Sequence, residues 1–183
     1  TLDGKSVEPI KPGKISDCKE FVEKYKDVEG FAIYGNDRYV AQYISEKYPE
    51  EEIKFDISKI GLYTIDIEVA AEEGFPDVFN VAEELLAITL QDAATKHITC
   101  FASRPFNNTR KDVTFVLCYD EFDLINKFLD WWQTTAPDVI TGWNCELYDI
   151  PYIVGRIGRL MGEKAVKKLS PWNNVRTREI QNH

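Results

Sequence analysis

Residues 63–69 read Tyr-Thr-Ile-Asp-Ile-Glu-Val, an apolar run that contains two carboxylates one residue apart. Successive side chains of a β-strand point to opposite faces, so Asp66 and Glu68 would share one face, about 6–7 Å apart. Ile65 and Ile67 would share the other face, which predicts a half-buried strand. Alternating carboxylates are ordinarily the solvated face of such a strand. Two like charges beside a core would also suit a divalent cation such as magnesium or manganese, and both interpretations stay open here.

A second segment, residues 141–152, reads Thr-Gly-Trp-Asn-Cys-Glu-Leu-Tyr-Asp-Ile-Pro-Tyr. It follows the apolar pair Val139-Ile140 and leads through a polar turn to Asp149. Apolar residues then recur at helical spacing, which predicts an amphipathic helix over 150–161 with Pro151 in its first turn. Asp149 would therefore lie at a helix entrance, where a carboxylate is favoured by the helix dipole and can cap backbone amides.

The rest of the chain from residue 57 alternates between strand and helix patterns. We expect a helix over 121–135 that is capped by Asp120, and a short helix over 163–169. Strands are expected at 60–69, 85–91, 97–102, 113–119 and 138–143, and as a last stretch within 172–183. This order predicts a mixed sheet covered by helices, that is, an α/β domain over 57–183.

Residues 1–56 differ in pattern and are expected to form a small α+β module of their own. Ser16-Asp17 would cap a helix that is closed by Gly30, and residues 31–35 read as a short strand. Asn36-Asp37 would turn into a second helix, which Pro49 stops. The aromatic residues of this module are expected to form its core rather than a platform for nucleic-acid bases: Tyr34, Tyr43 and Tyr48.

Composition narrows the class of protein. A 44% hydrophobic content is enough for a packed core, and no apolar run approaches the roughly 20 residues that span a membrane, so no membrane partner is expected. The net charge of −9 argues against simple electrostatic adhesion to nucleic acid, although a nuclease whose carboxylates recruit metal stays possible. The four cysteines form no Cys-x-x-Cys motif, which disfavours zinc and fits a reducing cytoplasm.

Taken together, four stretches resemble family B DNA polymerases, and most closely those of T-even-type tailed bacteriophages. These stretches are Asp66-Ile67-Glu68, Gly74-Phe75-Pro76, residues 141–152 and Leu169-Ser170-Pro171. The resemblance implies a ribonuclease-H-like fold and 3′→5′ proofreading exonuclease chemistry with two Mg²⁺ or Mn²⁺ ions. It assigns Asp66 as the ligand that bridges the ions. It assigns Glu68 to the ion that carries the nucleophile, and Asp149 to the ion on the leaving-group side.

The resemblance also implies the substrate and partners. The substrate would be the single-stranded 3′ end of primer DNA. The partners would be the remainder of a polymerase chain and possible replisome proteins, in the cytoplasm of an infected bacterium. Phe75 could wedge against an unstacked terminal base or cap the edge of the sheet, and Asn144 could bind the terminal nucleotide or satisfy its own turn. Trp143 and Tyr148 are expected to belong to the core.

The family's third exonuclease motif, a tyrosine followed by an aspartate, is expected beyond residue 183. The chain is accordingly expected to be an internal fragment, with an exonuclease domain truncated before this motif and with weak activity or none when isolated. Two alternatives remain. One is a non-catalytic nucleic-acid-binding or scaffold module on the same fold, which needs no metal site. The other is a free-standing nuclease of this fold, whose missing ligand would have to come from these 183 residues.

Overall fold

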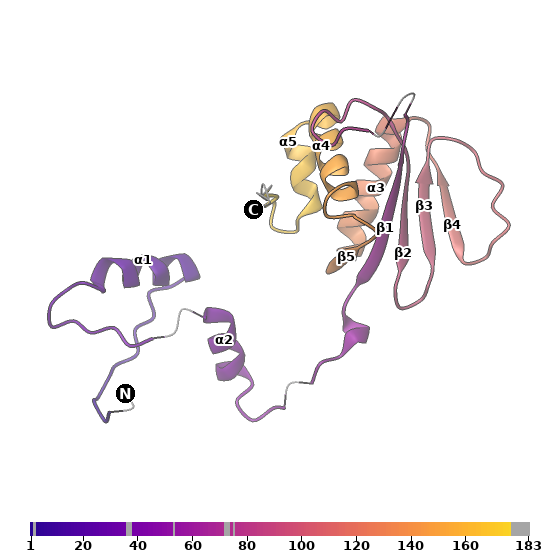
Figure 1. The fold of residues 1–183 in the computed structure, drawn as a ribbon. Coiled ribbons are helices and arrows are strands. Elements are labelled where there is room, and N and C mark those ends of the chain that lie inside the picture. Colours follow the sequence, from indigo (N-terminus) through magenta and orange to yellow (C-terminus); the bar gives the residue numbers. More distant parts are fainter. Residues whose placement is uncertain (2, 36–37, 53, 72–73, 75, 177–183) are drawn as a thin grey trace. The chain divides into compact units, whose positions relative to one another are not determined.

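The chain divides into two compact units, residues 1–55 and 56–183, and each is described by itself. The structure is a computed structural model, drawn as a ribbon in Figure 1. It describes residues 1, 3–35, 38–52, 54–71, 74 and 76–176.

The first unit contains two helices, α1 (Ile15–Tyr25) and α2 (Tyr39–Lys47). Helix α1 begins at Ile15, slightly before the expected cap, so Ser16 and Asp17 lie in its first turn, where the Asp17 carboxylate accepts a hydrogen bond from the Lys14 amide at 2.9 Å. It ends five residues before Gly30. Beyond it, Phe31 packs against the Tyr25 ring with 5.1 Å between ring centroids, so this segment contacts the preceding helix.

Two expectations for this unit are wrong. Residues 31–35 form no strand, and the described part of residues 1–55 contains no strand with which they could pair, so the α+β description fails for what is seen of this module. Its tyrosines do not form a core either. Tyr34 and Tyr43 are 53% and 57% exposed, and Tyr48 is 38% exposed, because two short helices offer little surface against which to bury them. The expected turn at 36–37 lies outside the described residues.

The second unit is built on a five-stranded mixed sheet, as predicted. Its strands are β1 (Leu62–Val69), β2 (Leu85–Asp92), β3 (Ile98–Ala102), β4 (Val113–Leu117) and β5 (Val139–Thr141). Their order across the sheet is β4-β3-β2-β1-β5, which places β1 beside the short strand β5 (Figure 1). Strand β2 pairs antiparallel with both β1 and β3, whereas β5 runs parallel to β1 and β4 runs parallel to β3.

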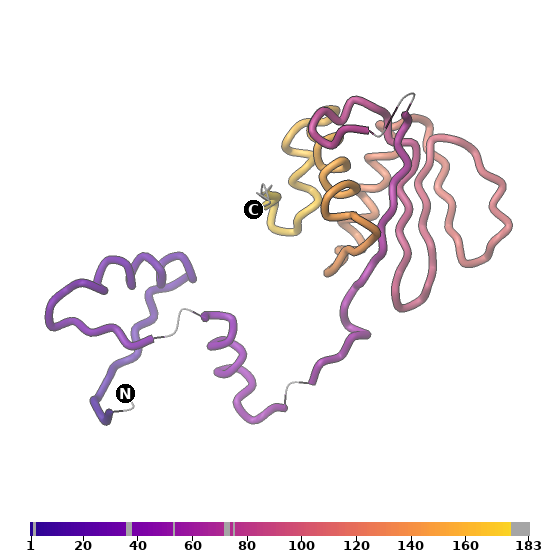
Figure 2. Tube along the Cα trace, in the orientation of Figure 1, coloured from indigo at the N-terminus to yellow at the C-terminus, as the bar shows by residue number. Residues whose placement is uncertain are grey.

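Helices cover one face of this sheet, and the path of the chain can be followed in Figure 2. The covering helices are α3 (Glu121–Thr135), α4 (Asp149–Met161), α5 (Glu163–Val166) and η2 (Lys167–Leu169), whereas η1 (Ile57–Lys59) precedes β1 in the chain. Helix α3 has the predicted bounds, and the Asp120 carboxylate caps it by accepting a hydrogen bond from the Asp123 amide at 2.8 Å. Figure 1 shows α3 and α4 on the same side of the sheet.

The core lies between the sheet and these helices. Strand residues and helix residues of this core are almost fully buried: Ile65, Ile67, Ile88, Leu90, Phe101, Leu124, Phe128, Ile153 and Ile157. On α3, Phe122 is half exposed, whereas Leu124 is buried in the core. The Trp132 indole donates a hydrogen bond to the Leu169 carbonyl at 3.0 Å, which ties η2 to α3.

The strand predicted within residues 172–183 is absent from the part of that stretch that the structure describes. Residues 172–176 form no strand, and the remaining residues of the stretch, 177–183, lie outside the described residues. Among the helices of the described residues, none is long and apolar enough to cross a membrane.

Candidate active site

Strand β1 presents its two carboxylates as expected. Asp66 and Glu68 are exposed, while the alternating residues Ile65 and Ile67 are 1% and 7% exposed and lie in the core. Since the core side of the sheet is covered by helices, both carboxylates lie on the opposite face of β1. The prediction that they share one exposed face is confirmed.

The edge of β1 becomes free halfway along the strand. Strand β5 pairs with it only from Leu62 to Thr64, and the chain then turns away at Gly142. A Cβ atom at Gly142 would lie 2.5 Å from the Ile65 carbonyl oxygen, so only glycine allows the turn to pass this close to the strand. The amides of β1 beyond this point are therefore available to other partners.

Asp149 occupies the freed edge. Its Oδ1 atom accepts a hydrogen bond from the Ile67 amide at 3.1 Å, across 82 residues of sequence. Asp149 is the first residue of α4 and is 4% exposed. The N-cap position is occupied by Tyr148, so Asp149 is the first residue inside the helix rather than its N-cap residue. Its carboxylate instead joins α4 to the strand that carries Asp66 and Glu68.

The charges of these carboxylates influence one another. Burial raises the pKa of the Asp149 carboxyl group, and the negative charge of Asp66 raises it further. The pKa of the Tyr148 phenol is raised by burial first and then by the charges of Asp149, Glu83 and Glu68. Tyr148 is half-buried and lies among carboxylates from three parts of the chain, so it belongs only partly to the core.

The three predicted metal ligands lie on or beside β1, but they do not form a closed ligand cluster. Within the described ranges, no group of three His, Cys, Asp or Glu side chains is close enough together to hold a metal ion. The donor chemistry suits a hard divalent cation, because all three groups offer carboxylate oxygens and the Asp66–Asp149 pair carries unfavourable like charge. Their role as metal ligands stays a prediction.

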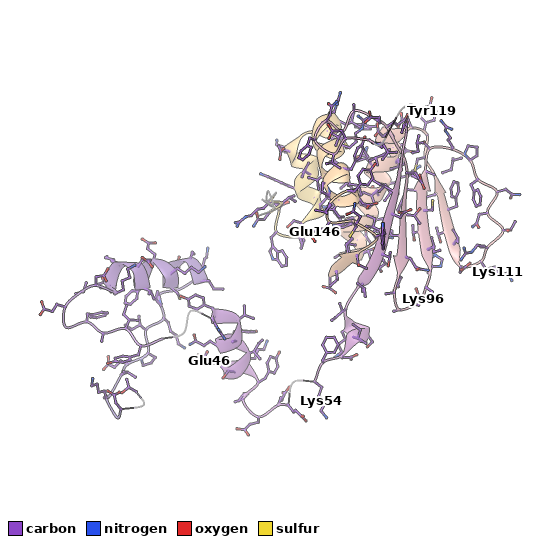
Figure 3. All side chains as sticks on the ribbon, in the orientation of Figure 1. Glu46, Lys54, Lys96, Lys111, Tyr119 and Glu146 are labelled. Carbon is purple, nitrogen blue, oxygen red and sulfur yellow. The ribbon has the colours of Figure 1, made fainter. Side chains whose placement is uncertain are left out.

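The loop between β5 and α4 carries Asn144, the predicted contact to the terminal nucleotide. Asn144 is exposed and has a left-handed backbone with φ +57°, and its carbonyl accepts hydrogen bonds from the amides of Leu147 and Tyr148 at 3.0 Å. Its backbone thus builds the turn, while its side chain stays a predicted contact. Trp143 is 94% exposed in the same loop, so its expected place in the core is wrong. Figure 3 labels Glu146 on this loop; Phe75 lies outside the described residues.

Sequence reasoning missed a buried polar network beside this site. Arg156 of α4 donates two hydrogen bonds of 2.7 Å to the Glu121 carboxylate, and both residues are less than 10% exposed. The same guanidinium donates to the carbonyls of Val81 and Ala82 at 2.9 Å, and Glu121 accepts from the Leu85 amide at 2.7 Å. The only sequence signal was an arginine in helical register with buried apolar residues.

Hydrogen bonds from side chains of α3 and α4 hold the connection between β1 and β2 against the helices. The Tyr152 hydroxyl donates to the Glu83 carbonyl at 2.8 Å, and Arg159 donates to the Asn80 carbonyl at 2.9 Å. Burial raises the pKa of Tyr152 to about 12, so its hydroxyl stays protonated and able to donate. This connection follows directly after the carboxylate strand, and four side chains of α3 and α4 hold it in place.

Comparison with known proteins agrees with this architecture. The family model described as DNA polymerase family B, exonuclease domain, matches residues 16–183. The chain is 29% identical over 191 residues to the DNA-directed DNA polymerase of Escherichia phage RB69, covering 91% of the chain and 21% of that protein. It is 26% identical over 204 residues to the enzyme of the same name from Enterobacteria phage T4, covering 98% of the chain and 22% of that protein.

A shorter stretch extends the likeness to another virus. Over 52 residues the chain is 40% identical to the DNA polymerase of Autographa californica nuclear polyhedrosis virus, which covers 28% of the chain and 5% of that protein. The chain spans about a fifth of the length of the two phage polymerases. The match over residues 16–183 shows that the chain belongs to the exonuclease-domain family of the family B DNA polymerases.

Proposed function

We propose that this chain is the 3′→5′ proofreading exonuclease region of a replicative DNA polymerase of a tailed phage, acting in the cytoplasm of the infected bacterium. Membership of the family supports this proposal. The observation that carries it is the approach of the Asp149 carboxylate to β1, where it accepts a hydrogen bond from the Ile67 amide beside Asp66. This contact brings together the two segments that hold the proposed catalytic residues.

In the proposed reaction, Asp66, Glu68 and Asp149 hold two Mg²⁺ or Mn²⁺ ions. When bound, the ions supply a hydroxide near neutral pH and neutralise charge on the phosphate being cleaved. The chain supplies the placement of the ligands. The Ile67 amide fixes one oxygen of Asp149, and the rigid strand β1 fixes the separation of Asp66 from Glu68. Since the pKa of Asp149 is raised, cation binding would compete with a proton at this carboxylate and would strengthen with pH.

We propose that the substrate is the single-stranded 3′ end of primer DNA. The exposed side chain of Asn144 lies on the loop that leads to Asp149 and would contact the terminal nucleotide. Phe75 would stack on the terminal base, a contact worth roughly 1–3 kcal/mol for a base on an aromatic ring. The remainder of the polymerase chain would deliver this end to the site, and replisome proteins would be further partners.

The experiment compares excision with extension in the polymerase that we propose to contain this chain. Replacing Asp66 and Glu68 by Ala should leave extension of matched primers nearly unchanged and should abolish removal of a mismatched 3′ nucleotide. Both side chains are exposed and lie outside the core, so the melting temperature should not fall. Equal loss of extension and excision at unchanged melting temperature would contradict the assignment. Excision that survives in the double variant would favour the non-catalytic module.

Robust nuclease activity of the 183-residue chain by itself would point to the free-standing nuclease. This outcome is read from the release of mononucleotides by the isolated chain with magnesium. We expect little or none, because the proposed site includes the tyrosine and aspartate of a third motif. The lack of these groups should slow the reaction on the order of 10³-fold or more.

A further inference from the structure

The last third of the second unit is basic, although the chain as a whole carries a net charge of −9. Residues 150–176 contain six Lys or Arg residues and a single acidic residue, Glu163. One of the six, Arg156, forms the buried ion pair with Glu121 and is not free to bind a ligand. The other five are exposed: Arg159, Lys164, Lys167, Lys168 and Arg176.

Three of these residues form a ridge on α5 and η2, which we call the lysine ridge: Lys164, Lys167 and Lys168. Lys167 and Lys168 lie three and four residues after Lys164, so each is a neighbour of Lys164 on the surface of these helical turns. The opposite side is anchored, because Ala165 and Val166 are 7% and 5% exposed. Within the part of the chain that the structure describes, no carboxylate pairs with these three lysines.

An exposed aromatic residue follows the lysine ridge closely in the chain. Trp172 is 82% exposed and follows η2 through two turns. In these turns the Ser170 amide donates to the Lys167 carbonyl at 3.1 Å, and the Trp172 amide donates to the Ser170 hydroxyl at 3.3 Å. The indole is thus tied by short local bonds to the segment that carries the lysines. Exposed cations beside an exposed aromatic ring are the two features that bind single strands, through phosphates and through base stacking.

We propose that the lysine ridge and Trp172 bind single-stranded DNA at a surface separate from the carboxylates. Asp66 and Glu68 lie on the face of β1 that the helices leave uncovered, whereas α5 and η2 pack on the helix-covered side, where the Trp132 indole donates to the Leu169 carbonyl at 3.0 Å. This surface would extend the proposed function, on which it rests, because the chain would bind the same class of ligand at a second place. It needs no metal ion, since phosphate is attracted here by lysine.

The experiment measures binding of a fluorescent 20-nucleotide thymidine strand to the 183-residue chain by anisotropy, in EDTA and low salt. The test variant is Lys164→Gln/Lys167→Gln/Lys168→Gln. The matched control is Lys59→Gln/Lys96→Gln/Lys111→Gln, which removes the same charge elsewhere on the second unit; Figure 3 labels Lys96 and Lys111 at the loops beside β3 and β4. Circular dichroism verifies that both variants fold.

We expect the test variant to bind at least tenfold more weakly and the control variant less than about twofold more weakly. Loss of three phosphate contacts should reduce the slope of log affinity against log salt by about 2, at about 0.7 per contact on a single strand. Trp172→Ala should weaken binding about fivefold or more, as expected for a lost base stack. The variant with three arginines in place of the lysines should bind like the original chain.

Three results would overturn the proposal: no binding by the original chain at low salt, equal losses in the two triple variants, or competition by polyglutamate as effective as that by unlabelled DNA. The last would show a surface for any polyanion, including an acidic protein segment. Because EDTA removes divalent ions, this assay does not depend on the carboxylates. Its failure would leave the exonuclease proposal standing, and failure of the excision assay would leave this surface standing.

Discussion

Removal of the Arg156 guanidinium should strongly destabilise the second unit. In Arg156→Met the apolar stem is kept, while the Glu121 carboxylate, 8% exposed, loses its partner. Leaving one charge of a buried pair uncompensated costs about 3–5 kcal/mol. The Val81 and Ala82 carbonyls lose a donor as well, which adds to this cost. At about 2–4 °C per kcal/mol for a chain of this size, the melting temperature should fall by about 6–20 °C.

Arg159 provides the matched control, one turn further along α4. It is exposed and donates one described hydrogen bond, to the Asn80 carbonyl, so Arg159→Met should cost about 1 kcal/mol or less. The assay is urea unfolding followed by tryptophan fluorescence, because Trp131 and Trp132 lie on the helix that carries Glu121. The double variant Glu121→Leu/Arg156→Met removes both charges and should cost less than the sum of the single variants. Equal costs for the two arginines, or simple additivity, would refute the reasoning.

Three further substitutions test other contacts. Asp149→Asn keeps an acceptor for the Ile67 amide but removes the carboxyl group. Because the pKa of this carboxyl group is raised in the folded state, its stabilising contribution is complete at low pH and is lost as pH rises through the folded-state pKa. In urea unfolding the variant should therefore gain more stability at about pH 7 than at about pH 4, and an equal gain would contradict the burial of this charge. Tyr152→Phe leaves the Glu83 carbonyl without its hydroxyl donor and should cost about 1–3 kcal/mol, so an unchanged unfolding midpoint would speak against this tether. Trp143→Ala should change stability by no more than about 0.5 kcal/mol, since the indole is 94% exposed, and a larger loss would place the ring in the core after all.

Much of the second unit could be predicted from local pattern. The helical pattern over 121–135 and the Asp120 cap predicted the bounds of α3, and the alternation along 63–69 predicted the buried and exposed faces of β1. The family resemblance joined β1 to the entrance of α4. In these segments local propensity, helix capping and the burial pattern all favour the same structure, so a single sequence is enough to predict it.

The rest depends on contacts between distant parts of the chain. No local signal shows that Asp149 would bind the Ile67 amide rather than cap its own helix, because this depends on β5 ending at Thr141. The Glu121–Arg156 pair joins residues 35 apart and equally escapes a local reading. In residues 1–55 the aromatic residues were predicted to form a core, but the two short helices offer too few neighbouring side chains to bury them.

The most direct test of the central claim is Mn²⁺ binding to the 183-residue chain, followed by electron paramagnetic resonance. The site variant is Asp66→Asn/Glu68→Gln/Asp149→Asn, and the matched control is Glu50→Gln/Glu51→Gln/Glu52→Gln, which removes three carboxylates from the acidic run of the first unit. We predict that the original chain and the control bind Mn²⁺ alike, more tightly as pH rises above the ordinary range of a carboxyl group, and that the site variant loses this binding. Undiminished binding in the site variant, or its loss in the control alone, would contradict the assignment of Asp66, Glu68 and Asp149 as the metal site.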